Sequence, residues 1–340
     1  MRRRGRTVQE APVGGEVPAG KRLFLDLYRQ MVLIRRFEEA VQALFLRGKV
    51  FGSTHLCIGQ EAVSAGVCSV VQAKDRVAAT YRGHGHALAL GVDPRGLLGE
   101  LLGRAIGTCG GRAGSMNIID LEHGLMGCFG IVGGSIAAAT GAGLSLHRTG
   151  GVAIALFGDG AANQAYFHEC LNFAKVFSLP VVYVCENNQY GEFTPMEKVT
   201  PGGILARPTA MGISSESADG QDVWAMRAAA ERAVERARSG HGPVFIEAVT
   251  YRYSDHGRGD PIQYRPEGEM EAWKARDPLD IARARLSRDY GVEGEELNGI
   301  VAAVDTQLED VRAQVLDAPY PASDSLGSEF KAGPAGEADG

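Results

Sequence analysis

The sequence of 340 residues predicts an α/β protein with a mostly parallel sheet flanked by helices on both faces. Two apolar runs, at 152–157 and 181–185, have the length and the β-branched residues of buried strands. Between them, apolar residues recur at helical spacing over 166–177, and Pro180 ends that pattern. A strand, a helix and a strand in this order predict two strands that are parallel neighbours.

Two polar side chains stand at the carboxyl ends of these strands, where ligands bind in open parallel sheets. Asp159 follows the first run and Asn188 follows the second. A carboxylate and an amide oxygen suit a hard cation such as Mg²⁺, which readily takes further oxygens from phosphates. Gly160 lets the backbone approach a ligand closely, and the N–H group of Ala161 is predicted to open a helix that favours an anion. The pattern therefore predicts a metal-bridged diphosphate site.

Each motif alone has a simpler interpretation. Asp159 by itself would only cap a helix, and Asn187-Asn188 by themselves would only form a turn. The two motifs together, each at the end of an apolar run, favour the metal site.

The pair GDG and NN resembles the thiamine diphosphate motif. The words GDGAANQ and ENNQYG are similar to the alpha subunit of the 2-oxo acid dehydrogenases of the pyruvate, branched-chain and acetoin type. This resemblance extends over about 27–286 and implies the thiamine diphosphate-binding fold. It also implies that Asp159, Asn188 and the backbone carbonyl of Tyr190 hold Mg²⁺, which in turn holds the cofactor diphosphate.

Composition and charge limit the class of protein further. Hydrophobic residues make up 45% of the chain, and the net charge of −6 comes from mixed acids and bases, so we expect no nucleic-acid partner. Six cysteines without CxxC spacing are typical of buried thiols in a reducing compartment. No segment has the roughly 18 apolar residues of a membrane span, and the basic start lacks the apolar run of a secretory signal. We expect a cytoplasmic protein with no membrane partner; a mitochondrial transit peptide is the alternative.

The chain begins with a segment, 1–20, that is rich in Arg, Gly and Pro and is expected to be disordered. The amphipathic pattern over 24–45 then predicts a long helix with an apolar stripe toward the core. Its solvated face is expected to consist of Arg35, Arg36, Glu38 and Glu39.

A second helix is predicted to begin at 59–62, and His55 lies in the loop before it. A lone loop histidine is more often structural or solvated than catalytic. The words HLCIGQEA nevertheless match the alpha-subunit family, and that resemblance assigns His55 to the active-site wall as a catalytic residue.

A short strand is predicted at 75–79, and the words TYRGHGH follow it. Arg82 at the end of a strand suits a phosphate, because its planar guanidinium matches that anion better than an ammonium does. Without its context, Arg82 would be an ordinary surface residue. The resemblance puts Tyr81 and Arg82 on the cofactor diphosphate.

The segment 103–120 holds too many glycines for a regular element, so we expect a flexible loop over the site. Relatives commonly have an active-site histidine where this chain has Asn117, and asparagine cannot carry a proton near neutral pH. The words FGIVGG then open a predicted helix at 135–146. By resemblance, Gly130 and Val132 touch the thiazolium and pyrimidine region of the cofactor.

A loop is expected over 191–212, followed by a helix at 223–238 and a buried strand at 243–251. The strand leads into the words YRYSDHGRGDP, which resemble the second mobile loop of the family. His256 matches the histidine that reaches the reactive carbon of the thiazolium. The resemblance therefore implies that His256 is catalytic and binds the cofactor.

Helices rich in Arg and Glu are expected over 262–317, and the Gly- and Ala-rich tail, 327–340, is expected to be disordered. We therefore predict one cofactor-binding α/β domain over 21–326, with helices at its C-terminal end. Thiamine diphosphate enzymes also need a glutamate on the aminopyrimidine, from a domain for which this chain has no room. The resemblance implies a separate beta subunit with the pyrimidine-binding domain, an α₂β₂ heterotetramer, and a dihydrolipoyl acyltransferase as a further partner.

Three functions remain open from the sequence. The first is a subunit that decarboxylates a 2-oxo acid or cleaves acetoin and passes the acyl group to lipoamide. The second is a biosynthetic carboligase of the acyloin type, which Asn117 and Ala137 motivate because relatives commonly have His and Pro there. The third is a noncatalytic cofactor-binding subunit, against which the intact Asp159, Asn188 and His256 argue.

Overall fold

The computed structural model describes residues 19–257 and 263–323. The predicted disordered tail, 327–340, and nearly all of the segment 1–20 lie outside these ranges. Residues 258–262, in the predicted mobile loop, lie outside them as well. Ala19 and Gly20 already belong to the first helix, so this helix begins before the predicted boundary.

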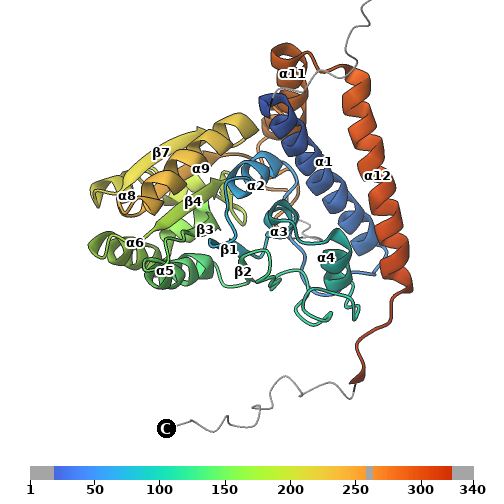
Figure 1. Ribbon diagram of the computed structural model, residues 1–340, viewed down its shortest axis with the longest axis horizontal. Coiled ribbons are helices and arrows are strands. Elements are labelled where there is room, and N and C mark those ends of the chain that lie inside the picture. Colours follow the sequence, from blue (N-terminus) through green and yellow to red (C-terminus); the bar gives the residue numbers. More distant parts are fainter. Residues whose placement is uncertain (1–18, 258–262, 324–340) are drawn as a thin grey trace, which may run out of the picture.

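The predicted α/β class is confirmed: a six-stranded sheet, parallel at every pairing, lies between layers of helices (Figure 1). Its strand order is β2-β1-β3-β4-β8-β7. The strands are β1 (Arg76–Thr80), β2 (Leu125–Phe129), β3 (Ala153–Gly158), β4 (Val181–Asn187), β7 (Ser214–Asp219) and β8 (Val244–Val249). A separate antiparallel pair consists of β5 (Tyr190–Gly191) and β6 (Thr194–Pro195).

The central strands are buried on both faces, which is why their sequences are continuous apolar runs. In β3, Ile154 and Leu156 belong to one core cluster, whereas Ala155 and Phe157 belong to another on the opposite face. Strands β3 and β4 are parallel neighbours in register from Ala153↔Val181 onward. The predicted strand–helix–strand unit is therefore confirmed.

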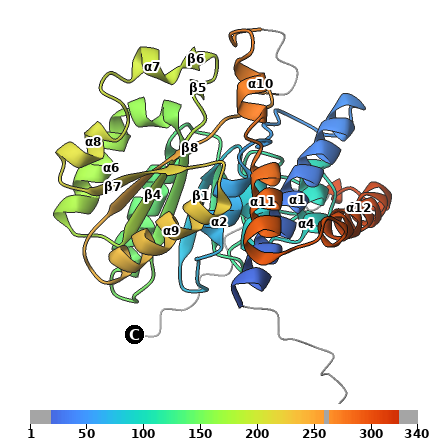
Figure 2. The same ribbon diagram turned by 90° about the horizontal axis from the view of Figure 1, so that it is seen from above.

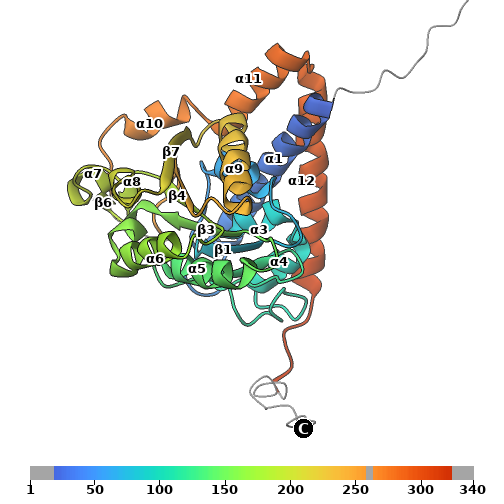
Figure 3. The ribbon, with the colours of Figure 1, turned by 60° about the vertical axis from the view of Figure 1, so that its left-hand side comes forward.

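Helices cover both faces of the sheet. On one face lie α5 (Gly134–Leu146) and α6 (Ala165–Val176), and on the other lies α9 (Val223–Arg238) (Figure 3). Helix α2 (Glu61–Cys68) packs beside α9 on that second face. The helices predicted at 135–146 and 223–238 are thus present. The predicted helix start at Ala161 is wrong, because Ala161 lies in the short 3₁₀ helix η1 (Asp159–Asn163) and the extended Gln164 separates it from α6.

A further group of helices packs beside the sheet and builds its own apolar core (Figure 2). Its members are α1 (Ala19–Leu46), α3 (His84–Leu90), α4 (Pro94–Leu101), α11 (Pro278–Tyr290) and α12 (Gly294–Asp317). Three short helices complete the described chain: α7 (Met196–Val199), α8 (Ala206–Ala210) and α10 (Glu269–Lys274). Across residues 19–257 and 263–323, no helical stretch has the length and hydropathy of a transmembrane span.

The predicted solvated face of α1 is partly wrong. Arg36 and Glu39 are exposed, but Glu38 is fully buried and accepts hydrogen bonds from Cys57 and from Nδ1 of His84, at 3.1 Å each. Arg35 is largely buried and pairs with Glu61 and Asp277. Helical periodicity identified the main buried stripe, but α2 and α3 also cover the flank of α1.

The sequence did not predict the two edge strands, β2 and β7. The sequence of β7 is SSESAD, and its residues are half-buried or exposed, so it has no apolar run to identify it. The predicted loop 191–212 likewise contains β6, the second residue of β5 and two short helices. Edge strands need less apolar surface than central strands, because one side of each is open.

The glycine-rich segment 103–120 forms no regular strand or helix, but one buried carboxylate organises its backbone. Glu100 is fully buried in α4. Its two oxygens accept hydrogen bonds, at 2.6–3.1 Å, from the backbone N–H groups of Cys109, Gly111, Ala113 and Gly114. Charge-assisted hydrogen bonds of this kind are stronger than those between neutral groups.

We expect Glu100→Gln to lower the free energy of unfolding by roughly 3 kcal/mol, because the new NH₂ group faces N–H donors and leaves them unpaired. Urea denaturation measures this loss. Glu122→Gln, at an exposed glutamate of the same region, is the matched control and should change the stability little. Equal stabilities for the two variants would contradict an organising role for Glu100.

Candidate active site

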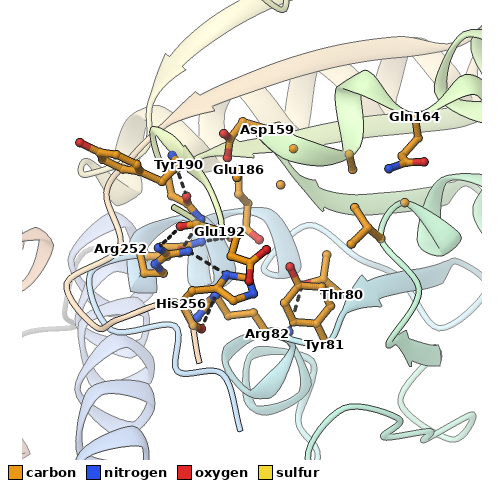
Figure 4. A pocket seen from close by; sticks show the side chains of 18 of the residues that line it. Thr80, Tyr81, Arg82, Asp159, Gln164, Glu186, Tyr190, Glu192, Arg252 and His256 are labelled. Carbon is orange, nitrogen blue, oxygen red and sulfur yellow. Dashed lines mark hydrogen bonds between the residues drawn. The ribbon is translucent and has the colours of Figure 1, made fainter. Parts of the chain in front are cut away.

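A cavity of about 310 Å³ opens at the carboxyl end of the sheet (Figure 4). From β1 the chain adds β2 on one side and later β3 on the other, so the direction of strand addition reverses there. In open parallel sheets, ligands bind at such a point of reversal. The lining residues that follow the strands are Tyr81 and Arg82 after β1, Ile131 and Val132 after β2, 159–161 after β3, Asn188 and Tyr190 after β4, and Arg252 and His256 after β8. All predicted site residues line this cavity except Gly130 and His55.

Asp159 supplies a buried carboxylate at the first residue of η1. Its side chain is 2% exposed, and its Oδ2 atom has no hydrogen-bond partner in the described chain. Burial raises the pKa of Asp159 to about 6, although its own backbone, Gly160 and the charges of Arg252 and Arg82 oppose that shift. A buried carboxylate oxygen with a free lone pair at a cavity fits a cation ligand.

The two asparagines after β4 have different roles. Asn187 donates to Glu247 at 2.8 Å and accepts from the backbone N–H of Gln189 at 3.2 Å, so it forms the turn of the simpler interpretation. Asn188 lines the cavity and is 6% exposed. Its Nδ2 atom donates to Gln60, and within residues 19–257 and 263–323 its Oδ1 atom accepts only a long contact of 3.4 Å from the N–H of Tyr190. The amide oxygen of Asn188 therefore remains available to a cation.

Tyr190 is held by its hydroxyl, which donates to Glu269 at 3.0 Å. Tyr251 donates to the other oxygen of Glu269 at 2.6 Å, so this carboxylate connects the segment after β4 to the segment after β8.

Gly160 also lines the cavity, but the group that approaches its backbone closely is another glycine of the same chain. A Cβ atom at Gly160 would lie 3.3 Å from the Cα of Gly191. The described residues contain no cluster of three or more His, Cys, Asp or Glu side chains that could hold a metal, so a cation here would depend on amide and carbonyl oxygens as well.

Two buried arginines give the cavity its positive charge. Arg82 is 5% exposed and donates to the carbonyl of Leu56 at 2.6 Å and to that of His256 at 3.0 Å. Arg252 is 2% exposed and donates to the carbonyl of Glu192 at 2.9 Å. Burial, together with the neighbouring charge of Arg252, lowers the pKa of Arg82 to about 10. Two guanidinium groups so placed favour an anion such as a diphosphate.

Arg252 was not predicted from the sequence. The sequence did contain an indication of this role, because Arg252 comes soon after the buried strand β8, as Arg82 comes soon after β1. Gln60 and Glu186 also line the cavity and were not predicted. They lie in or beside the predicted motifs, in the words GQEA and ENNQYG. Each is a single polar residue outside any periodic pattern, so the sequence did not indicate that it lines the cavity.

His256 lies at the cavity between aromatic and cationic groups (Figure 4). Its Nδ1 atom is 3.3 Å from a guanidinium nitrogen of Arg252, which can only donate, so Nδ1 is the acceptor and the proton of the neutral ring is on Nε2. Burial and the charges of Arg82 and Arg252 lower the pKa of His256 to about 3. The imidazole is therefore neutral at physiological pH.

His55 stands behind the cavity wall. It is 9% exposed, and its ring centroid lies 4.6 Å from that of Tyr81 and 5.0 Å from that of His256. The structure thus brings His55 to the two predicted aromatic site residues but not to the cavity surface. Its catalytic role stays a prediction.

Gly130 is exposed beside the lining residue Ile131. A Cβ atom at Gly130 would lie 3.6 Å from the Oδ1 atom of Asn117. Asn117 is also exposed and donates to the carbonyl of Ala113 at 3.4 Å. The residue that replaces the usual histidine therefore lies next to a predicted cofactor contact.

Comparison with known proteins gives consistent matches over most of the chain. Residues 29–324 match the family described as Dehydrogenase E1 component. The alpha subunit of acetoin:2,6-dichlorophenolindophenol oxidoreductase of Bacillus subtilis (strain 168) is 40% identical over 306 residues, covering 89% of this chain and 91% of that protein. The pyruvate dehydrogenase E1 component subunit alpha of Porphyra purpurea is 39% identical over 312 residues, covering 88% and 90%. The acetoin:2,6-dichlorophenolindophenol oxidoreductase alpha subunit of Cupriavidus necator is 37% identical over 324 residues, covering 94% and 97%.

We expect the ¹³Cε1 resonance of His256 to show no titration step near pH 6.5, because its pKa is lowered to about 3. Arg252→Met should raise that pKa, since it removes a neighbouring positive charge. Histidine-labelled protein titrated between pH 4 and 8 measures both.

The lowered pKa of His256 also makes the free energy of unfolding depend on pH. The unfolded chain takes up a proton at His256 as the pH falls through about 6.5, while the folded chain does not. As the pH falls from about 6.5 to about 3, His256 therefore lowers the free energy of unfolding progressively. Arg236→Met, at an exposed arginine of α9, is the control and should leave the titration unchanged. A His256 pKa near 6.5 in the unaltered protein would contradict the described surroundings of the ring.

Proposed function

The chain belongs to the Dehydrogenase E1 component family, and from that premise we propose that its cavity holds the diphosphate end of thiamine diphosphate through Mg²⁺. The protein is the alpha subunit of a heteromeric E1 enzyme, which implies a beta subunit as its partner. The observation that carries the proposal is a buried carboxylate with an unpaired oxygen, Asp159, which lines the same cavity as two buried guanidinium groups. The carboxylate suits a cation, and the guanidinium groups suit the anion that the cation would bind.

The proposed ligands of Mg²⁺ are Asp159 through Oδ2, Asn188 through Oδ1 and the backbone carbonyl of Tyr190. All three residues line the cavity. A hard cation prefers such oxygen donors and completes its shell with phosphate oxygens and water. Arg82 and Arg252 would pair with the remaining charge of the diphosphate, and Gly160 and Ala161 at the start of η1 line the same cavity.

When bound, thiamine diphosphate supplies the carbon nucleophile and the electron sink for cleavage next to a carbonyl. The residues of this chain hold and orient it. His256 is neutral and carries its proton on Nε2, so that nitrogen can donate a hydrogen bond. Tyr81 and His55 pack against the ring of His256 and fix its position.

A beta subunit would complete the site. The cavity of about 310 Å³ is at the small end of the roughly 300–1,000 Å³ range of ligand pockets, which is consistent with a pocket shared between chains. The rim residues Ile131 and Val132 are 72% and 40% exposed, and exposed apolar groups beside a site favour a covering partner. We propose an α₂β₂ heterotetramer that passes its acyl group to a dihydrolipoyl acyltransferase.

We also propose a cytoplasmic location. All six cysteines are free thiols, and four of them are buried, which supports a reducing compartment.

We propose pyruvate or acetoin as the substrate, since the relatives carry both names. The alternatives of a carboligase and of a noncatalytic subunit gain no support from these relatives. The test is the purified alpha and beta chains together, given each substrate with lipoamide or dichlorophenolindophenol as the acceptor. We expect reduction of the acceptor with one of the two substrates. Carbon–carbon bond formation without reduction of an acceptor would instead indicate carboligation.

We expect Asp159→Ala to weaken Mg²⁺-dependent binding of thiamine diphosphate by at least 10–100-fold, because even groups behind the metal ligands contribute about that much. Titration calorimetry on the assembled alpha and beta chains measures the affinity. Asp310→Ala, at an exposed aspartate of α12, is the control and should bind as the unaltered protein does. Unchanged binding in Asp159→Ala would overturn the metal site.

A further inference from the structure

We propose that Glu186 and Gln60 are positioning residues that decide which end of the Asn188 amide faces the cation. The inference rests on the proposed function, in which Asn188 binds Mg²⁺ through its oxygen. Glu186 is on β4, and Gln60 directly precedes α2. Both line the cavity, and they are 3% and 1% exposed.

A continuous chain of hydrogen bonds joins these residues inside the protein. Nδ2 of Asn188 donates to Oε1 of Gln60 at 3.2 Å, and Nε2 of Gln60 donates to Oε1 of Glu186 at 3.2 Å. The other oxygen of Glu186 lies 3.0 Å from Nε2 of His86, whose Nδ1 lies 2.9 Å from the hydroxyl of Ser64. Each of these side chains is at least 94% buried.

The carboxylate of Glu186 sets the direction of the whole chain. A side-chain amide has an oxygen and a nitrogen of nearly equal shape, so packing alone does not choose its orientation. A carboxylate only accepts hydrogen bonds, and it therefore requires the NH₂ group of Gln60 and the Nε2 proton of His86. The oxygen of Gln60 then faces Asn188, so Asn188 must donate a hydrogen bond from its own NH₂ group. The oxygen of Asn188 is left on the opposite side, free for a cation.

Burial makes this orientation strict. Turning the amide of Gln60 around would place its oxygen against the oxygen of Glu186 and leave donors unpaired where the side chains are closed to solvent. Asn187 is not part of this chain of hydrogen bonds, since its NH₂ group donates to Glu247. The two adjacent asparagines are therefore oriented by two different carboxylates, and only the one tied to Glu186 faces the cavity.

The test compares two substitutions in the assembled alpha and beta chains. Glu186→Gln keeps the shape but removes the group that sets the direction, and Gln60→Met removes the link to Asn188. We expect each to weaken Mg²⁺ binding, measured by calorimetry at saturating thiamine diphosphate, by about 10–100-fold, as is usual for groups that orient metal ligands. Metal-free binding of thiamine diphosphate in the presence of a chelator should stay unchanged, because Arg82 and Arg252 are untouched.

The matched control is Gln221→Met, at another fully buried glutamine, which bonds Thr250, Tyr253 and Arg276 and does not line the cavity. It should lower the thermal stability without changing the affinity for Mg²⁺. If Gln60→Met does not assemble, the conservative Glu186→Gln decides the question alone.

Three outcomes would overturn the inference. Normal Mg²⁺ affinity in Glu186→Gln, when Asp159→Ala loses it, would reject the positioning role and leave the proposed function intact. Equal weakening of metal-dependent and metal-free binding would show a merely structural role. Normal Mg²⁺ affinity in Asp159→Ala itself would remove the metal site and the inference with it.

Discussion

The parallel pairing of β1, β3, β4 and β8 brings the carboxyl ends of four strands to one edge of the sheet, and the site depends on that pairing. The register aligns Gly158 with Glu186 and Asn187 with Val249. Residues that come directly after these positions therefore meet, although nearly a hundred residues of chain separate Asp159 from Arg252. Apolar cores on both faces of the sheet fix the register, since a shift of one residue would turn every side chain to the opposite face, into a core packed for other side chains.

The cavity carries charge that the protein itself does not neutralise completely. Asp159 keeps one unpaired carboxylate oxygen, and Arg82 and Arg252 place two like charges next to each other. Burying such groups is unfavourable unless they are paired. A metal-bridged diphosphate would offset both charges at once, so the apparent cost in the free chain is consistent with a site shaped for its ligand.

Buried or half-buried carboxylates also hold neighbouring segments of the chain together. Glu100 collects four N–H groups of the glycine-rich segment, and Glu38 joins α1 to His84 at the start of α3. Glu269 holds Tyr190 and Tyr251 together. Each of these residues accepts hydrogen bonds from groups outside its own helix. Because an ionised carboxylate has no donor, each one also fixes the orientation of its partners.

The sequence by itself determined the α/β class, the central strands and the position of Asp159 and Asn188 after them, because continuous apolar runs and the residues that end them are local features. Through the resemblance to a known family, it also indicated about half of the cavity lining, including Tyr81, Arg82 and His256. Only the tertiary structure decided that β2 and β7 flank the sheet, that Glu38 is buried, and that Arg252, Gln60 and Glu186 line the cavity. The physical reason is that burial of a polar side chain depends on which distant segment packs over it. Periodicity within one helix or strand does not contain that information.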